Sequence, residues 1–321
     1  MSSFAKPTVV VSKCLGFEAC RFDGRRLCSP FVQALKPYVN FVPVCPEVRI
    51  GLGTPREPIE LVRTGSEISL CQPTTGRNLT RTMNAFAHRF LSSQQDVDGF
   101  ILKGRSPSCG IGDVRIRSLT DNHRTESRHG SGVFAAQVLK RCGDLAVTTD
   151  SRLARDRARE HWLTGLFTLA AFRLSMRSGS MKRLVAFHRY NRHLLAACNQ
   201  GRARRLDAAM RACDRKHPRA TFAEYQLHLR AAMSRPPRRA SVRKILAGAL
   251  DYYSTHLDAS ERHAFSRSLE RYCQGEFPLS ALRKTLQVWA VRYDKTFLRS
   301  DSFFRPYPGE LADINSWRKS E

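Results

Sequence analysis

Three cysteines each follow a segment that is predicted to be a β-strand. They are Cys14 after Thr8–Ser12, Cys45 after Phe41–Val44 and Cys109 a few residues after Gly99–Lys103. In open parallel sheets, ligands bind just beyond the carboxyl ends of the strands, so one rim can collect thiols that are 31 and 64 residues apart. Thiolates are soft ligands that suit an iron–sulfur cluster or zinc. Ordinary buried cysteines are the alternative, and Cys20 and Cys28 lie close enough in sequence to replace one of the three as a ligand.

Polar side chains accompany these cysteines where a plain apolar core would not place them. The nearest are Glu47, Lys103, Ser106 and Ser108, with Arg21, Asp23 and Arg56 in the other two loops. A carboxylate beside a metal centre can act as general acid or base once burial raises its pKa. A hydroxyl can donate to a developing negative charge. Asp23-Gly24 is also a common turn signal, so both interpretations stay open for Asp23.

The elements that would position these groups alternate between strand-like and helix-like patterns. Thr8–Ser12 is a continuous β-branched run, which is typical of a strand buried on both faces of a parallel sheet. Pro43 favours an edge or terminal position for Phe41–Val44, because proline removes one ladder donor. The other predicted elements are strands at 99–103 and 144–148, and helices at 79–91, at 132–141 and from Ser29-Pro30. We expect a doubly wound, Rossmann-like α/β domain with a parallel sheet.

From about Asp150 the strand patterns vanish and helical patterns rich in Arg, Ala and Leu replace them. The predicted helices are 152–177, 180–198, 203–214, 220–233, 241–255, 259–272 and 278–298. Glycine or proline interrupts them at Ser178-Gly179, Pro218, Pro236-Pro237 and Pro278. We therefore expect two domains, residues 1–150 and an all-α domain of residues 151–321.

The composition indicates a globular protein. Of its 321 residues, 42% are hydrophobic and 26% charged, which excludes wholesale disorder. No apolar run approaches the roughly 18 residues that cross a bilayer, and the N-terminal residues lack the pattern of a secretion signal. We expect a cytoplasmic protein without membrane contact, whose ten cysteines are mostly reduced. The absence of Cys-x-x-Cys counts against zinc ribbons and thioredoxin-like pairs.

The formal charge of +26 is unevenly distributed. Residues 1–150 contain 20 Lys and Arg against 13 Asp and Glu, whereas residues 151–321 contain 34 against 15. A domain with this excess can bind nucleic acid through its phosphates. Solvated helix faces rich in arginine are the simpler interpretation, since arginine is a good helix former. A purely structural or dimerising role for this domain is a third possibility.

Five segments carry a resemblance that extends over residues 7–150. They are SKCLGFEACRFDG (12–24), PVCPEVRIGLGTPREPIEL (43–61), GRNLT (76–80), ILKGRSPSCG (101–110) and GSGVFAAQVL (130–139). An early cysteine before an Arg-aromatic-Asp-Gly turn, then CPE, then SPSCG resemble the bacterial thiouracil desulfurase family. The turn reads RFDG where the family usually has RYDG, and Arg49-Ile50-Gly51 replaces the double glycine after CPEV.

The resemblance implies a [4Fe-4S] enzyme with its cluster on Cys14, Cys45 and Cys109 and one iron that has no protein ligand. It implies non-redox, hydrolytic conversion of thiouracil to uracil with release of hydrogen sulfide, the free iron acting as a Lewis acid. An RNA-binding protein that acts on thiolated nucleic acid is the alternative function.

Residue roles carry over by motif. The resemblance implies that Glu47 transfers protons, and that Ser106 and Asp23 hold the ring or the water. Ser108 and Lys103 are the expected substrate contacts.

The second half resembles a helical module of unknown function that often follows this desulfurase domain. The similar segments are LVAFHRYNRHLL (184–195) and FFRPYPGEL (303–311). The module's FH-x-x-x-K appears as Phe187-His188 with Arg192 in place of lysine, and Cys198 stands where histidine is common. His188 is a candidate contact for substrate or RNA, although a lone histidine beside an apolar helix face is usually structural.

Overall fold

The computed structural model describes residues 4–118, 128–212, 218–293 and 301–312. The chain divides into two compact units. One unit is residues 6–155, and the other combines the residues before 6 with those from 156 onward. Each unit is described by itself.

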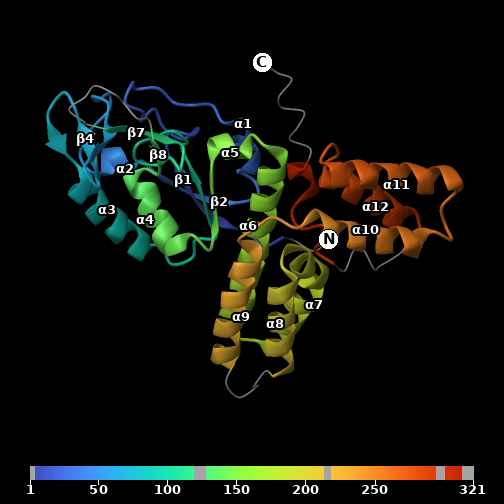
Figure 1. The fold of residues 1–321 in the computed structure, drawn as a ribbon. Coiled ribbons are helices and arrows are strands. Elements are labelled where there is room, and N and C mark those ends of the chain that lie inside the picture. The colour runs from blue at the N-terminus through green and yellow to red at the C-terminus, as the bar shows by residue number, and fades with distance from the viewer. Residues whose placement is uncertain (1–3, 119–127, 213–217, 294–300, 313–321) are drawn as a thin grey trace. The chain divides into compact units, whose positions relative to one another are not determined.

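A parallel sheet forms the centre of the α/β unit. Its strands, in spatial order, are β2 (Asn40–Val44), β1 (Thr8–Ser12), β6 (Gly99–Leu102) and β9 (Ala146–Thr149), all of them parallel (Figure 1). The prediction of a parallel sheet is confirmed. Pro43 lies on an edge strand, as expected, and every residue of β6 is buried.

Among the described residues the α/β unit has five helices. Those at 30–35, 80–93 and 133–142 lie close to predicted positions, whereas the short helices at 46–49 and 150–153 were not predicted as such. The five are α1 (Pro30–Leu35), α2 (Pro46–Arg49), α3 (Thr80–Ser93), α4 (Val133–Cys142) and α5 (Asp150–Leu153). α3 and α4 lie side by side (Figure 1). Phe86 of α3 stacks on Phe134 of α4 with ring centroids 6.0 Å apart, and both rings join the core that contains Phe100 of β6. Burial of such aromatic side chains dominates the energetics of a small core.

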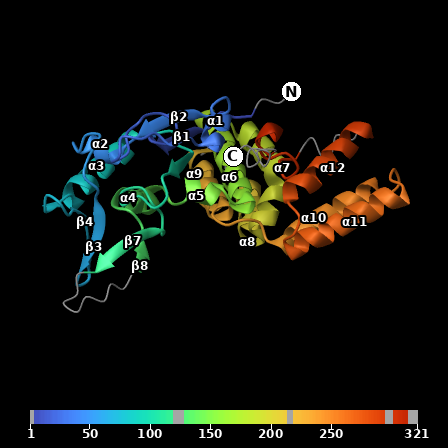
Figure 2. The ribbon, with the colours of Figure 1, turned by 90° about the horizontal axis from the view of Figure 1, so that it is seen from above.

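A second sheet lies in the same unit and was not predicted. Its spatial order is β5 (Arg77–Asn78), β4 (Glu67–Gln72), β3 (Glu60–Thr64), β7 (Val114–Ser118) and β8 (Arg128–Gly130) (Figure 2). The pairing of β3 with β7 is parallel and the other pairings are antiparallel. β7 alternates buried and exposed residues, as a strand with one solvated face does.

The second unit is helical in its described parts, as predicted. Its helices are α6 (Asp156–Arg177), α7 (Met181–Cys198), α8 (Gln200–Arg211), α9 (Pro218–Met233), α10 (Arg239–Tyr253), α11 (Ala259–Gln274) and α12 (Leu279–Arg292). A short 3₁₀ helix spans Gly309–Leu311. Pro218 begins α9 and Pro278 caps α12, because proline is tolerated where an N–H would lack a partner. None of the helices described has the length and apolar character needed to span a membrane.

Both ends of the described chain pack into the helical unit. Asp301 pairs with His193 of α7 at 2.6 Å, and the Ser302 N–H donates to the Tyr190 carbonyl at 2.8 Å. Phe4, which precedes the α/β unit in sequence, meets Phe167 of α6 edge to face, with ring centroids 5.8 Å apart. The helical unit therefore uses chain from before and after the α/β unit.

Gly132 lets the loop that carries Cys109 approach the start of α4. A Cβ at Gly132 would lie 2.4 Å from the carbonyl carbon of Ser108 and 2.6 Å from the carbonyl oxygen of Pro107. The same backbone is fixed by hydrogen bonds from Val133 N–H to Pro107 and from Ala135 N–H to Ser108. No side chain fits between the loop and the helix.

We expect Gly132→Ala to lower the urea midpoint of unfolding, because overpacking against backbone costs about 1–3 kcal/mol. Gly248→Ala is the control, since Gly248 lies inside α10 with no atom within 4 Å of an added Cβ. That change should leave the midpoint unchanged or raise it, because alanine is the better helix former. Equal midpoints for the two variants would contradict the close approach at Gly132.

Candidate active site

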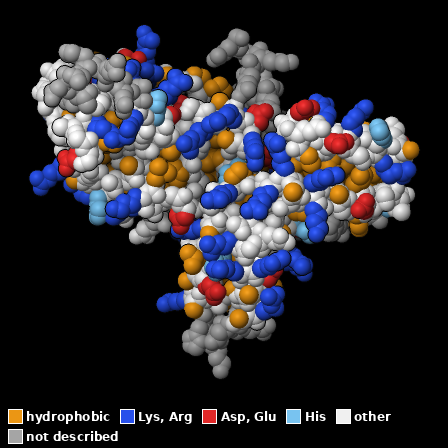
Figure 3. Space-filling view, viewed as in Figure 1, with side chains coloured by type: hydrophobic (Ala, Val, Ile, Leu, Met, Phe, Trp, Pro, Cys, Tyr) orange, Lys and Arg blue, Asp and Glu red, His pale blue; other side chains and the backbone are white. Residues whose placement is uncertain are grey.

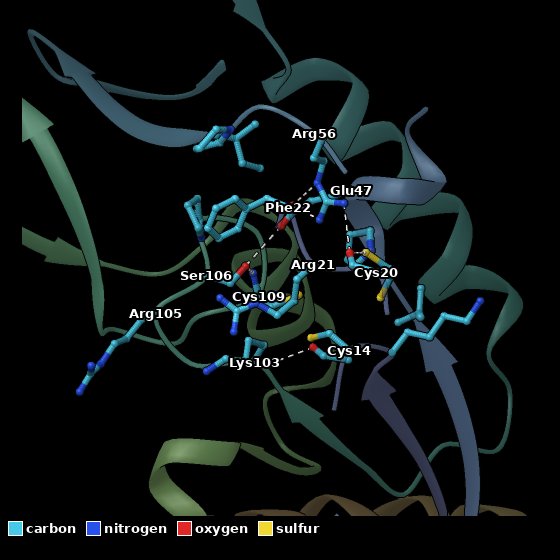
Figure 4. A pocket seen from close by; sticks show the side chains of 18 of the residues that line it. Cys14, Cys20, Arg21, Phe22, Glu47, Arg56, Lys103, Arg105, Ser106 and Cys109 are labelled. Carbon is cyan, nitrogen blue, oxygen red and sulfur yellow. Dashed lines mark hydrogen bonds and ion pairs between the residues drawn. The ribbon is translucent and has the colours of Figure 1, made fainter. Parts of the chain in front are cut away.

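A cavity of about 360 Å³ opens beyond the carboxyl ends of β1, β2 and β6. Four cysteines line it: Cys14, Cys20, Cys45 and Cys109. The loops after the three strands supply them, and Figure 4 shows side chains from these loops around one space. The predicted meeting of distant thiols at one rim is therefore present in the structure.

Burial and neighbouring thiols raise the pKa values of Cys14 and Cys109. Burial, together with a smaller contribution from the neighbouring Cys45, raises the pKa of Cys14 to about 12. Cys109 has a relative exposure of 4%, and burial raises its pKa well above the ordinary value, with contributions from Cys14 and Cys45. Thiols in this state stay protonated unless a cation takes the place of the proton. A positively charged metal centre would supply that cation.

Cys20 is a fourth thiol at the cavity and packs against Cys45. The Cys45 Sγ lies 3.8 Å from the carbonyl oxygen of Cys20. A hydrogen bond from the Cys20 thiol lowers the pKa of Cys45 to about 7, and the same contact, together with burial, raises the pKa of Cys20. Cys28, the other neighbour in sequence, is exposed and does not line the cavity.

The donor set of the cavity is rich in sulfur. Four thiols share it, and thiolates are the ligands that hold iron–sulfur clusters. Among the residues that the structure describes, no three His, Cys, Asp or Glu side chains form a single-ion site. The cationic residues Arg56 and Lys103 also line this cavity, and each is paired with a carboxylate, Glu47 and Asp150 respectively.

Glu47 is held at the cavity by Arg56. The Arg56 Nε and Nη2 donate to the same carboxylate oxygen, Oε2, at 2.9 and 2.6 Å. The Arg56 Nη1 donates to the carbonyl oxygens of Cys20 at 3.0 Å and Gly53 at 2.8 Å. The arginine side chain is buried, with a relative exposure of only 4%. Its hydrogen bonds to Cys20 and Glu47 join the first loop to the second. Oε1 of Glu47 is thereby directed towards Ser106 (Figure 4).

Ser106 is oriented by the loop that carries Cys109. Its Oγ accepts hydrogen bonds from the N–H groups of Ser108 and Cys109, both at 3.2 Å. The hydroxyl hydrogen is thereby directed away from the loop and towards Glu47 Oε1, which lies 3.5 Å from Oγ. A carboxylate and a hydroxyl therefore face the cavity as one pair.

Ser12 joins the ends of two strands beneath the cavity. Its Oγ accepts from the Lys103 N–H at 2.9 Å, and its side chain also hydrogen-bonds the Cys109 thiol. The Lys103 ammonium lines the cavity and pairs with Asp150 at 3.0 Å. Lys103 is thus held by the first residue of α5.

Asp23 and Ser108, which were also predicted as site residues, do not line the cavity. Asp23 accepts from the Arg25 N–H at 3.1 Å and pairs with Arg21 at 3.3 Å, which is the geometry of a turn. Ser108 is fully buried, and its Oγ has no partner among the described residues. The roles assigned to these two residues stay predictions.

Sequence reasoning missed one contributor to the site, Ser12, and the partner of another, Arg56. Ser12 was treated as the end of a strand, although a polar residue that closes a β-branched run was a usable signal. The contact of Arg56 with Glu47 joins residues nine apart across a loop, and no sequence pattern foretold it.

Models of two protein families match separate stretches of the chain. The 2-thiouracil desulfurase model matches residues 9–150. A model described as a protein of unknown function, DUF1722, matches residues 192–308. The first match contains the whole cavity, and the second lies within the helical unit.

Two similar proteins cover the N-terminal part of the chain. The uncharacterized protein YbbK of Bacillus subtilis (strain 168) is 32% identical over 142 residues, which are 42% of this chain and 91% of YbbK. A solved structure of the [4Fe-4S]-dependent thiouracil desulfidase TudS is 31% identical, with a TM-score of 0.36 over 46% of this chain and 94% of that chain. Through residues 9–150, the chain belongs to the 2-thiouracil desulfurase family.

Proposed function

We propose that this protein is an iron–sulfur-cluster-dependent desulfurase that converts thiouracil, or a similar thiolated pyrimidine, to the corresponding oxo compound. The observation that carries the proposal is the shared cavity. Thiols from three separate loops line it, beside a carboxylate and a hydroxyl that face each other. The match to the 2-thiouracil desulfurase family supports the same reaction.

Cys14, Cys45 and Cys109 would hold a [4Fe-4S] cluster, one on each of the three loops. Three protein ligands leave one iron of a cubane without a side chain. Cys20 is not counted as a ligand, because its thiol hydrogen-bonds Cys45. When bound, the cluster supplies an iron that accepts the sulfur of a thiocarbonyl as a Lewis acid.

The reaction needs water and no electron donor. A thiocarbonyl and water give a carbonyl and hydrogen sulfide, so the oxidation state of the carbon is unchanged. Glu47 takes a proton at Oε1 from the water that attacks the thiocarbonyl carbon, and returns a proton to the departing sulfur. Ser106 orients that water through its hydroxyl, and Arg56 keeps the carboxylate facing the cavity.

Lys103 is suited to an oxygen of the pyrimidine ring. Its ammonium lines the cavity and is held by Asp150. It can therefore donate a hydrogen bond to a ring oxygen while staying away from the thiols. We also propose a Rossmann-like arrangement for the parallel sheet, because the strand order changes direction between β1 and β6, where such folds bind ligands. A cytoplasmic location belongs to the same proposal, since that compartment keeps thiols reduced.

We expect anaerobically purified protein to contain about four iron and four acid-labile sulfide per chain. Cys109→Ser should lose most of both, because a buried ligand is removed. Cys20→Ser and the exposed Cys28→Ser should keep them. Iron and sulfide analysis checks this, and loss of iron in Cys20→Ser would mean four protein ligands and no free iron.

Glu47→Gln should retain iron but release sulfide from 2-thiouracil about 10²–10⁴-fold more slowly, because the proton-transfer group is lost. The matched control is Glu57→Gln, since Glu57 is exposed and lies outside the cavity lining. Steady-state sulfide release, normalised to iron content, measures the effect. Equal rates for Glu47→Gln and Glu57→Gln would refute the role given to Glu47.

The charge of the helical unit favours a second candidate, an enzyme that acts on thiolated RNA. Residues 151–321 carry 34 Lys and Arg against 15 Asp and Glu. Figure 3 shows Lys and Arg spread over the helical unit on the visible face, with few acidic side chains among them. Distributed cations of this kind bind phosphate backbones without reading sequence.

If this candidate is correct, the full chain binds RNA with an affinity that falls steeply as salt rises. The slope of log K against log salt is about −0.7 for each phosphate neutralised on a single strand, so several contacts give a slope of magnitude above about 2. Fluorescence anisotropy with a labelled RNA over a salt series measures it. Absent or salt-independent binding would remove the candidate and leave the desulfurase proposal for free pyrimidines intact.

A further inference from the structure

The helical unit contains a cavity of its own, of about 270 Å³. Its walls come from the first turns of α6, the Pro236–Pro237 segment before α10, and the turn between α11 and α12. The residues that matter for its chemistry are Arg157, Glu160, His161, Arg239, Tyr272 and Arg283. All of them belong to the helical unit.

Arg283 forms the buried end of this cavity. It has a relative exposure of 4%, and its Nη1 donates to Glu160 at 2.6 Å. Its guanidinium also lies over the Phe303 ring, 4.9 Å from the centroid. The Nε is buried and has no hydrogen-bond partner among the described residues. An unpaired donor on a buried cation is costly unless an acceptor completes it.

His161 adds a second unsatisfied group on the same wall. Its Nδ1 is buried and lacks a partner among the described residues. Burial and the nearby Arg157 lower the pKa of His161 to about 4, so the imidazole is neutral at physiological pH. A neutral imidazole can donate or accept, which suits the polar edge of a ring. Tyr272 and Phe277 provide aromatic surface in the same cavity.

The charges around the cavity leave two cations available. Each carboxylate in the lining is engaged by an arginine: Asp156 by Arg159, Glu160 by Arg283 and Glu276 by Arg271. Arg157 and Arg239 have no carboxylate partner within the part of the chain that the structure describes. The guanidinium of Arg239 is held by the Cys273 carbonyl at 3.3 Å and packs on Gly275, where a Cβ would lie 2.5 Å from it. Arginine guanidinium groups are preferred partners of phosphate and carboxylate.

We propose that this cavity binds a small anionic ring compound, in which a phosphate or carboxylate is joined to a planar ring. The anionic group meets Arg157 and Arg239, the two cations without a carboxylate partner among the described residues, and the unpaired Nε of Arg283 is a further donor. The ring lies against Tyr272 and Phe277 with its polar edge at His161. The volume of about 270 Å³ lies near the lower end of the range of small-molecule sites, about 300–1,000 Å³. This site is separate in sequence from the cysteine cavity and does not depend on the cluster.

The test is isothermal titration calorimetry of the full chain with four probes: uridine 5′-monophosphate, orotate, uridine and inorganic phosphate. The first two carry both an anionic group and a ring, and they distinguish phosphate from carboxylate. We expect at least one of them to bind in a one-to-one ratio, at least tenfold more tightly than uridine or phosphate. Equal affinity for phosphate alone, or no binding of either ring anion at millimolar concentration, would overturn the proposal.

Variants locate the binding. Arg239→Gln and His161→Ala should each lower the affinity for the bound probe at least tenfold. The control is Arg243→Gln, because Arg243 is an exposed arginine on the same helix α10 outside the cavity, and this change should alter the affinity less than twofold. Glu47→Gln should leave the affinity unchanged, because it alters only the other cavity. Loss of binding in Glu47→Gln, or unchanged binding in both Arg239→Gln and His161→Ala, would place the ligand elsewhere and refute the site. Circular dichroism of each variant confirms that it is folded.

Discussion

Parallel hydrogen bonding between β1 and its two neighbours constrains everything at the cysteine cavity. Val11 is in register with Pro43 of β2 on one side and with Ile101 of β6 on the other. Three strands therefore end at nearly the same level and release their loops on one side of the sheet. Thiols that are far apart in the chain meet because the parallel strands place all three loops at the same end of the sheet. A one-residue slip in either pairing would turn the strand's side chains to the opposite face and separate the loops.

The ion pair between Arg56 and Glu47 fixes the loops that the strand pairing brings together. The buried Arg56 donates two hydrogen bonds to Glu47 and a third to the Cys20 carbonyl. One side chain thus orients the carboxylate and joins the loops that carry Cys20 and Glu47. Removing one partner of such a buried pair costs far more than the pair contributes in isolation, because the remaining charge is left without compensation. The same contact leaves one carboxylate oxygen free to face Ser106. One arginine side chain therefore fixes both the two loops and the direction of the Glu47 carboxylate.

Much of the fold was predictable, because the decisive signals were local. β-branching marked Thr8–Ser12, and prolines marked the starts of α9 and α12. The second sheet was not predictable in this way, since β3 pairs with β7 more than 50 residues later and β7 alternates arginines with apolar residues inside a longer irregular stretch. The residues of the candidate site likewise fall into those that local sequence predicted and those that depend on distant contacts. The cysteines, Glu47 and Ser106 followed from motif and position, whereas the burial of Ser108 and the contacts of Ser12 depend on loops packed by distant neighbours.

Phe4 packs on Phe167, and Arg305 lies over the Phe4 ring at 5.3 Å, so the helical unit is built from both sides of the α/β unit. In topological terms the α/β unit is an insertion within the helical one. During synthesis the inserted unit is complete in the nascent chain while its host still lacks the helices α6 to α12. The helical unit can therefore be completed only after the whole α/β unit has been synthesised. Separating the two at residue 155 would cut a host domain rather than a linker.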